Sequence, residues 1–162
     1  MTSKDLKRLK KLCERKKIKI SLAESCTGGL VSSSITSIAG SSNFFESAII
    51  SYSNNAKIEL LGINKNLILK HGAVSKEVAL SMAKNLHRLT RSHICASITG
   101  IAGPGGGSKQ KPVGTVYFSI YQKIDNKIEI NNYKKIFNFK NRITIQKKSN
   151  DFLLQELIAI ID

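Results

Sequence analysis

A polar segment at residues 23–29, Ala-Glu-Ser-Cys-Thr-Gly-Gly, places two nucleophiles directly after a short apolar run. Ser25 or Cys26 could attack a carbonyl carbon, and the backbone N–H groups of the Thr-Gly-Gly that follows could stabilise the resulting oxyanion. The segment is also typical of a helix N-cap, because Ser and Thr favour that position for purely local reasons. The residues alone leave both interpretations open: an acyl-transfer site and the start of a helix.

A serine nucleophile needs a base, and none of the three histidines is well placed in the sequence. Tyr52 ends an apolar run, and Lys57 follows about one helical turn later, so both side chains are expected to face the same pocket. A lysine that burial keeps neutral can act as a general base, and a tyrosine can relay the proton. The alternative is that Lys57 faces solvent and Tyr52 lies at a strand edge.

A glycine-rich segment at residues 99–108 follows a third apolar run and predicts a second anion site. Its glycines allow backbone N–H groups to approach a phosphate or an oxyanion closely. The segment is not a Walker A loop, since Lys and Ser/Thr do not follow in that order, and no helix start follows as in a dinucleotide fingerprint. A flexible connector is the competing interpretation, because ordering so many glycines is costly.

Hydrophobic periodicity predicts helices and strands that alternate early in the chain and a hairpin after them. We expect helices over 3–16, 27–38, 54–61, 64–72, 75–90 and 142–161, and strands over 18–23, 45–52, 93–98, 113–124 and 127–139. This order predicts an α/β fold, a three-layer α/β/α sandwich with a mixed β-sheet, formed by residues 1–162 as one domain. The three polar segments all follow strands, where ligands of such sheets gather.

Two details of this prediction concern the core. The strand at 45–52 is expected to be buried, and the helix at 75–90 is expected to pack through Val78, Met82, Leu86 and Leu89. Cys13 and Cys95 fall in apolar patterns and are expected in the core as well. The three cysteines form no Cys-x-x-Cys pair, which indicates neither a disulfide framework nor a zinc site.

The net charge of +15 suggests nucleic-acid binding at first sight. However, Lys outnumbers Arg 21 to 5, and Ile (22) and Asn (12) are also frequent, so codons rich in A and T account for the excess. The basic residues gather in 1–20 and 121–150, away from the polar motifs, and a solvated surface without a nucleic-acid partner is expected. No run approaches the roughly 20 apolar residues of a membrane span, and no signal peptide is evident, so we expect a cytoplasmic protein without membrane contact.

The motifs together resemble the CinA C-terminal domain family, in order and spacing, over about residues 5–120. They are residues 23–29, Gly40-Ser41-Ser42 with Phe45, Tyr52-Ser53-Asn54 with Lys57, His71-Gly72-Ala73-Val74-Ser75, Thr99-Gly100-Ile101-Ala102-Gly103-Pro104 with Gly106-Gly107, and Lys111-Pro112-Val113-Gly114-Thr115-Val116.

This resemblance implies a nicotinamide-nucleotide amidohydrolase, which converts nicotinamide mononucleotide to nicotinate mononucleotide and ammonia in pyridine-nucleotide salvage. It implies Ser25 as the nucleophile, Tyr52 and Lys57 in proton transfer, no metal or other cofactor, and a homodimer. The residues expected to bind substrate are Glu24, Cys26, Thr27, Gly28, Gly29, Ser42, Asn54, Thr99, Gly100, Gly103, Gly106 and Arg142. Among these, Arg142 and the glycine loop are the candidates for holding the ribose phosphate, and Glu24 for orienting its neighbours.

The segment around residue 140 departs from the family pattern. Lys140 stands where the family usually has Gly, and Gln146 stands where it has a second Arg, although Asn141 and Arg142 remain. This departure motivates an alternative function: a catalytically weak or inactive nucleotide-binding or regulatory domain of the same fold. A basic nucleic-acid-binding module is a third possibility, and it would show a steep salt dependence of affinity.

Overall fold

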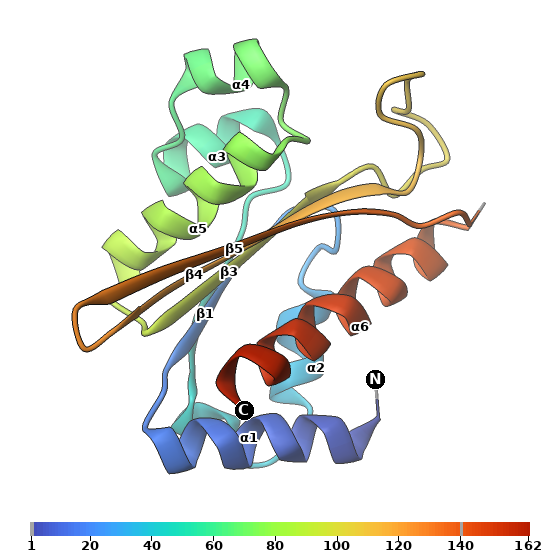
Figure 1. Ribbon diagram of the computed structural model, residues 1–162. Helices are drawn as coiled ribbons and strands as arrows, with labels where there is room; N and C mark the ends of the chain where they lie inside the picture. Colours follow the sequence, from blue (N-terminus) through green and yellow to red (C-terminus); the bar gives the residue numbers. More distant parts are fainter. Residues whose placement is uncertain (1, 140) are drawn as a thin grey trace.

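The computed structural model describes residues 2–139 and 141–162, and Lys140 of the departing segment lies outside them. A five-stranded sheet in the order β2-β1-β3-β4-β5 lies between two layers of helices (Figure 1). Its strands are β1 (Ile20–Glu24), β2 (Phe45–Ile50), β3 (Ile94–Gly100), β4 (Thr115–Ile124) and β5 (Lys127–Ile136). The helices are α1 (Ser3–Lys16), α2 (Leu30–Thr36), η1 (Ser41–Asn43), α3 (Asn54–Leu61), α4 (Lys65–His71), α5 (Lys76–Thr90) and α6 (Arg142–Ile161).

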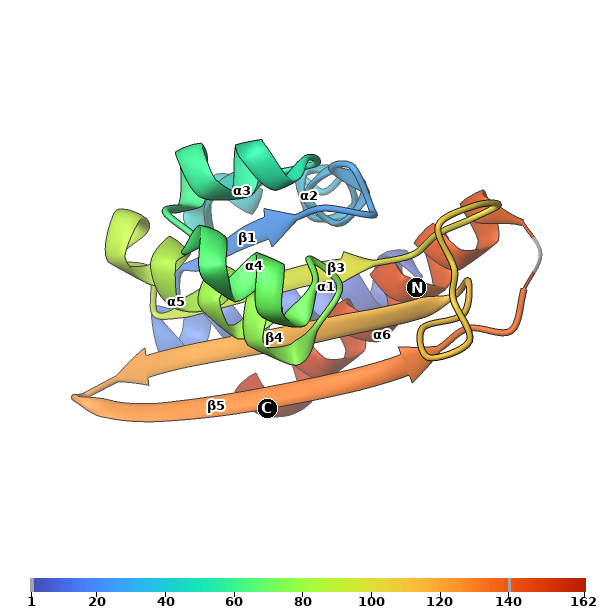
Figure 2. The same cartoon turned by 90° about the horizontal axis from the view of Figure 1, so that it is seen from above.

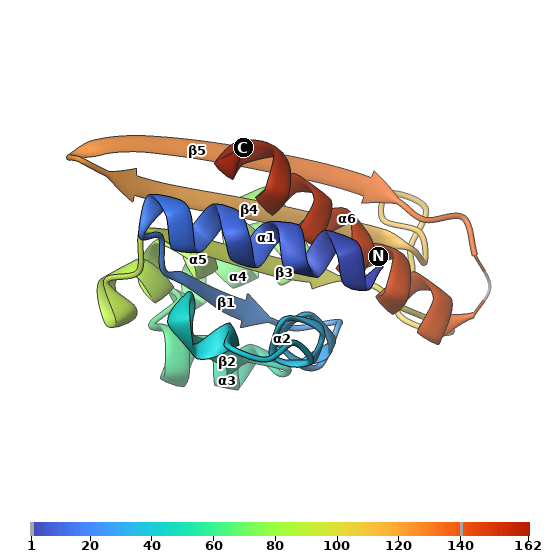
Figure 3. The same cartoon turned by 90° about the horizontal axis from the view of Figure 1, so that it is seen from below.

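The predicted three-layer sandwich with a mixed sheet is confirmed. Strands β1, β2 and β3 are parallel to one another, and the β4–β5 hairpin continues the sheet in antiparallel pairing. Helices α1, α2 and α6 cover one face, and α3, α4 and α5 lie on the other (Figures 1 and 3). Each helical layer encloses an apolar cluster of its own against the sheet.

Strand β1 lies between β2 and β3. The chain therefore adds β2 on one side of β1 and then crosses over to add β3 on the other side, so the strand order reverses at β1. Helix α2, which follows β1, lies on one face, and α3, α4 and α5, which follow β2, lie on the other (Figure 1), while Figure 2 looks down on the face that carries α3–α5. In such sheets this reversal leaves a crevice outside the carboxyl ends of the strands. The segment that begins at Ser25 leaves β1 at that point.

Local hydrogen bonds explain several of the predicted helix starts and the predicted hairpin. The Ser53 and Ser75 side chains accept hydrogen bonds from N–H groups in the first turns of α3 and α5, and Asn141 does the same for α6. The β4–β5 turn consists of Asp125 and Asn126, both at positive φ, as a two-residue hairpin turn requires. Cys13 and Cys95 are fully buried, as predicted.

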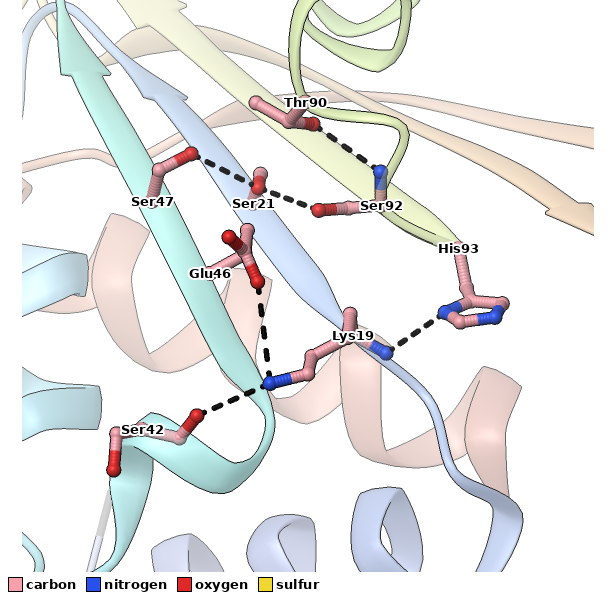
Figure 4. Close-up of polar contacts among 8 residues, drawn as sticks. All are labelled: Lys19, Ser21, Ser42, Glu46, Ser47, Thr90, Ser92 and His93. Atoms are coloured by element: carbon pink, nitrogen blue, oxygen red, sulfur yellow. Dashed lines mark hydrogen bonds and ion pairs between the residues drawn. The ribbon is translucent and has the colours of Figure 1, made fainter.

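A polar network ties the amino ends of the three parallel strands together (Figure 4). The Ser21 hydroxyl of β1 lies 3.1 Å from the Ser47 hydroxyl and 2.8 Å from the Ser92 hydroxyl. The backbone N–H of Lys19 donates to Nδ1 of His93 at 3.0 Å, and its Nζ donates to the Ser42 carbonyl at 3.2 Å. These bonds fix the strands relative to one another at the end of the sheet opposite Ser25.

Three expectations about individual elements are wrong. Helix α2 begins at Leu30, three residues later than predicted, because Gly28 and Gly29 at positive φ form a turn first. Strand β2 is an edge strand whose residues are half-buried or exposed, so its apolar run does not mark a buried strand. Leu89 is 59% exposed, because it lies in the last turn of α5 and outside the apolar cluster that this helix shares with the sheet.

Within the part of the chain that the structure describes, no helix has both the length and the apolar character needed to cross a bilayer.

The central position of β1 predicts its contribution to stability. Leu22 has no exposed surface, whereas Leu69 is 72% exposed. Leu22→Ala should lower the free energy of unfolding by about 2–5 kcal/mol through lost burial and a residual cavity. The matched substitution Leu69→Ala should change it by less than about 0.5 kcal/mol. Urea unfolding followed by circular dichroism measures both values, and equal losses would contradict this assignment of the core.

Candidate active site

Ser25 and Lys57 meet at the carboxyl end of β1. The Nζ atom of Lys57 lies 2.9 Å from Oγ of Ser25 and donates to the Ser51 carbonyl at 2.8 Å. Ser25 is 7% exposed and Lys57 is 1% exposed, so the pair is almost fully removed from water. The structure therefore brings together the two residues that the sequence proposed as nucleophile and base.

The backbone around the pair explains this meeting. The Ser25 N–H donates to the Ile98 carbonyl of β3 at 3.0 Å, and the Ser51 N–H donates to the Glu24 carbonyl at 2.8 Å. The sheet pairing thus continues one residue beyond β1 and β2 and fixes both segments. Because Ser53 caps α3, Lys57 comes one helical turn later and its side chain reaches back to the strand ends.

Burial lowers the pKa of the Lys57 ammonium below its usual 10.5, and the nearby Cys26 thiol opposes this shift. The cause is desolvation, which penalises the charged form of an amine. The described residues offer Nζ only a hydroxyl and a carbonyl as hydrogen-bond partners. Burial therefore moves the titration of Lys57 toward the neutral amine, which is the form that can accept a proton from a serine.

The carboxylate of Glu24 caps helix α2. It accepts hydrogen bonds from the N–H groups of Gly29, Val31 and Ser32 at 3.0, 3.2 and 2.8 Å, and from the Thr27 hydroxyl at 2.6 Å. Glu24 has no exposed surface and is occupied by these contacts, which suits the orienting role expected of it and gives it no contact surface for a substrate. The N-cap interpretation of Ser25 and Thr27 is therefore wrong, because a carboxylate from β1 satisfies these donors.

This capping also corrects the expected set of free backbone N–H groups. The Gly29 N–H donates to Glu24, and the Gly28 N–H donates to the Ser25 carbonyl at 3.0 Å, so neither is available to an oxyanion. The Thr27 N–H has no acceptor among residues 2–139 and 141–162, and the Cys26 N–H contacts only its own sulfur there. Of the three backbone N–H groups predicted to stabilise an oxyanion, only that of Thr27 is still available. The N–H of Cys26, which was not predicted, is a second candidate.

Cys26 competes poorly for the role of nucleophile. Burial raises the pKa of its thiol to about 12, and Lys57 and Arg142 only partly oppose this effect. The thiolate is the reactive form of cysteine, so a thiol with this pKa is inert near neutral pH. Ser25 has a hydrogen-bonded amine beside it and Cys26 has none, which favours Ser25.

Arg142 at the start of α6 joins two of the predicted loops. Its guanidinium donates to the Gly103 carbonyl at 2.8 Å and to the hydroxyl of Tyr52. Tyr52 is 57% exposed and makes no hydrogen bond to Ser25 or Lys57 in the described chain. The structure thus brings Tyr52 to Arg142 and not to the Ser25–Lys57 pair, which leaves the predicted proton relay without direct contact.

The predicted residues of the glycine-rich segment fall into two groups, one packed at the end of β3 and one in the loop beside Arg142. Thr99 is buried and its hydroxyl donates to the Ala73 carbonyl at 3.0 Å, while a Cβ on Gly100 would lie 2.7 Å from Val116 and 2.9 Å from the Thr115 carbonyl. These two residues pack the end of β3. Gly103 and Gly106 lie at positive φ in the loop that Arg142 contacts, and Gly106 is exposed.

Of the two remaining predicted substrate residues, one lies apart from this cluster. Ser42 lies beside Lys19 at the amino end of β1 (Figure 4). The reason is that η1, which contains Ser42, leads into the start of β2 and therefore lies at the end of the sheet opposite Ser25. Asn54 is exposed in the first turn of α3. Sequence reasoning also missed Ser51, whose carbonyl holds Lys57; a backbone acceptor leaves no signal in the side-chain pattern.

No group of three or more His, Cys, Asp or Glu side chains suited to a metal ion occurs among the described residues.

The fold and the site define a class of protein: an α/β/α domain with a buried Ser–Lys pair at the carboxyl edge of its parallel strands. The model of the CinA C-terminal domain family matches residues 3–161. The chain is 51% identical over 154 residues to a CinA-like protein of Prochlorococcus marinus subsp. pastoris. That match covers 94% of this chain and 35% of the relative, so the chain spans about a third of the length of this relative.

Solved structures agree with this family. The competence/damage inducible protein CihA from Agrobacterium tumefaciens superposes with a TM-score of 0.90 at 32% identity, covering 100% of this chain and 98% of its own. A competence or damage-inducible protein from Enterobacter asburiae gives a TM-score of 0.89 at 26% identity, with coverage of 98% and 96%. The chain belongs to the CinA C-terminal domain family, as its motifs predicted.

The cap on α2 generates a stability prediction. Glu24→Gln should destabilise the protein by about 1–3 kcal/mol, because an amide keeps only one acceptor oxygen and turns a donor toward backbone N–H groups. Glu59→Gln on the exposed face of α3 is the matched control and should be neutral. Thermal and urea unfolding measure the difference, and a neutral Glu24→Gln would mean that the capping bonds add little stability.

The state of the Cys26 thiol is open to direct measurement. Because burial raises its pKa to about 12, Cys26 should react with iodoacetamide at pH 8 at less than about a hundredth of the rate of free cysteine. Mass spectrometry of the native protein locates the modified residue, and denaturation should restore normal reactivity. Rapid native alkylation of Cys26 with loss of activity would point to the thiol as nucleophile.

Proposed function

We propose that this domain hydrolyses the carboxamide of a nicotinamide nucleotide, with nicotinamide mononucleotide as substrate, and releases ammonia. The observation that carries the proposal is the buried contact between Ser25 and Lys57, in which an amine with a lowered pKa lies 2.9 Å from a serine hydroxyl. Such a pair can activate a serine without histidine. The family resemblance supplies the choice of substrate.

The reaction begins with the neutral amine of Lys57. One of its N–H bonds stays on the Ser51 carbonyl, and the 2.9 Å contact with Ser25, in which Nζ is the donor, reverses so that the Ser25 hydroxyl donates to the amine lone pair. As Oγ adds to the carboxamide carbon, its proton moves to Nζ and the carbonyl electron pair moves to oxygen. The N–H groups of Cys26 and Thr27 stabilise this oxyanion.

The tetrahedral intermediate collapses when Lys57 returns the proton to the leaving nitrogen. Ammonia departs and an acyl ester on Ser25 remains. Water then attacks the ester with Lys57 again as base, and the nicotinate product leaves with Ser25 regenerated.

The nucleotide part of the substrate needs a site for its phosphate. Arg142 is held by a carbonyl and a hydroxyl, and no carboxylate in the described chain neutralises it. A guanidinium in this state can turn two N–H donors toward a phosphate. We assign the ribose phosphate to Arg142 and the adjoining glycine loop, with Tyr52 as the residue that holds Arg142 in place. A homodimer in the cytoplasm remains part of the proposal.

Ammonia release tests the function. Purified protein should release ammonia from nicotinamide mononucleotide and little from free nicotinamide or simple amides, and Ser25→Ala should lower kcat by more than about a thousandfold. Ser34→Ala in α2 is the control. If Ser25→Ala kept near-wild-type activity, the nucleophile would be misassigned. Nucleotide binding without any ammonia would favour the non-catalytic alternative.

The lowered pKa of Lys57 sets the pH dependence. The base must be neutral, so kcat/KM should fall about tenfold per pH unit below the pKa of Lys57 and level off above it. That midpoint should lie below 10.5, because burial lowers this pKa. Lys57→Arg keeps N–H donors but stays protonated, so it should be inactive at every pH up to 10. A fully active Lys57→Arg would remove Lys57 from the role of base.

A further inference from the structure

Gln146 of α6 reaches the turn that carries the nucleophile. Its Nε2 donates to the Cys26 carbonyl at 2.8 Å in a partly buried position. Because the Gly28 N–H donates to the Ser25 carbonyl, Ser25–Gly28 forms a hydrogen-bonded turn with Cys26–Thr27 as its central peptide. Gln146 therefore holds the central peptide of this turn, whose carbonyl accepts no backbone hydrogen bond in the described chain.

The orientation of this peptide matters for the oxyanion. The Cys26–Thr27 bond is trans, so its C=O and N–H point in opposite directions. With the carbonyl turned toward α6, the Thr27 N–H points away from α6. Helix α3, which supplies Lys57, lies on that opposite side of the sheet (Figure 1).

The central peptide of a turn is also its most mobile part, since rotating it interconverts turn types with little movement of the neighbours. The hydrogen bond from Gln146 opposes this rotation. It also polarises the peptide, which makes the N–H on the other side a stronger donor. Both effects act on the Thr27 N–H, which has no acceptor among the described residues.

Helix α6 is placed to exert this hold. Ile145, next to Gln146, is fully buried, and Asn141 caps the helix, so this turn of α6 is anchored on both sides. Arg142 lies one helical turn before Gln146 and contacts the glycine loop and Tyr52. One face of α6 thus holds two loops of the site through neighbouring side chains.

We propose that Gln146 is a positioning residue, which fixes the Cys26–Thr27 peptide so that the Thr27 N–H faces the oxyanion formed on addition of Ser25. This inference rests on the proposed serine chemistry and assigns a role to a residue that departs from the family pattern. Gln and Arg both offer N–H donors, so the departure keeps a donor at this position and removes the charge.

The test compares four substitutions. Gln146→Ala removes the side chain, Gln146→Met keeps its length without a donor, and Gln146→Arg keeps a donor. Gln155→Ala makes the same chemical change on an exposed position of α6 and is the control. For each protein, kcat and KM for nicotinamide mononucleotide are measured, together with the rate at which a fluorophosphonate labels Ser25.

Loss of a whole oxyanion donor costs roughly 100- to 1000-fold in kcat, and loss of its positioning should cost about 10-fold or more. Gln146→Ala and Gln146→Met should show this loss in kcat with KM within about twofold, and the labelling rate should fall in parallel, because the phosphonyl oxygen uses the same donors. Gln146→Arg should restore both rates to within about threefold of wild type, and Gln155→Ala should match wild type.

Three results would overturn the proposal. The first is a Gln146→Met variant with wild-type kcat and a wild-type labelling rate. The second is a Gln146→Met variant in which only KM rises. The third is a Gln146→Arg variant that is as slow as Gln146→Met. Thermal unfolding checks that the variants are folded, and Gln146→Met keeps the test valid if Gln146→Ala does not fold. If wild type releases no ammonia from any pyridine nucleotide but Ser25 is still labelled, the substrate proposal fails while the labelling rates still decide the role of Gln146.

Discussion

A lysine amine with 1% exposure has to be satisfied by hydrogen bonds inside the protein, and this requirement organises the structure around it. Lys57 meets it with the Ser25 hydroxyl and the Ser51 carbonyl, which come from the ends of two neighbouring parallel strands. Both strand ends therefore have to stop at the same level, and α3 has to start where Ser53 caps it. The same burial that makes the amine costly also lowers its pKa, so the structural constraint and the proposed chemistry have one physical cause.

Capping of α2 and the contact with Lys57 are made by two different residues at the end of β1, although the sequence offered Ser25 for both. Glu24 satisfies the first N–H groups of α2, which leaves the Ser25 hydroxyl free to contact Lys57. A buried carboxylate with several N–H donors is a strong cap, because each hydrogen bond is charge-assisted. As a result the N–H groups of Gly28 and Gly29 are already hydrogen-bonded, while the Thr27 N–H has no acceptor in the described chain and is available to the proposed oxyanion.

Helix α6 completes the site from a distant part of the sequence. Arg142 and Gln146 contact the glycine loop and the nucleophile turn, which precede them by 39 and 120 residues. The departure from the family pattern at Gln146 is thus a change at a residue in direct contact with the nucleophile turn. It alters charge beside the site and preserves a donor, which is compatible with a working serine centre.

The sequence by itself determined the order of elements, the sandwich, the hairpin and the starts of α3, α5 and α6, because these depend on local periodicity and on side chains that bond to neighbouring backbone groups. It also identified Ser25 and Lys57 from residue type and motif. The tertiary structure alone decided that Glu24 caps α2, that Tyr52 meets Arg142, that Ser42 lies at the far end of β1 and that Leu89 is exposed. Contacts between backbone groups and distant side chains, such as Ser51 with Lys57 or Cys26 with Gln146, depend on which strand ends lie side by side, and no local pattern records that.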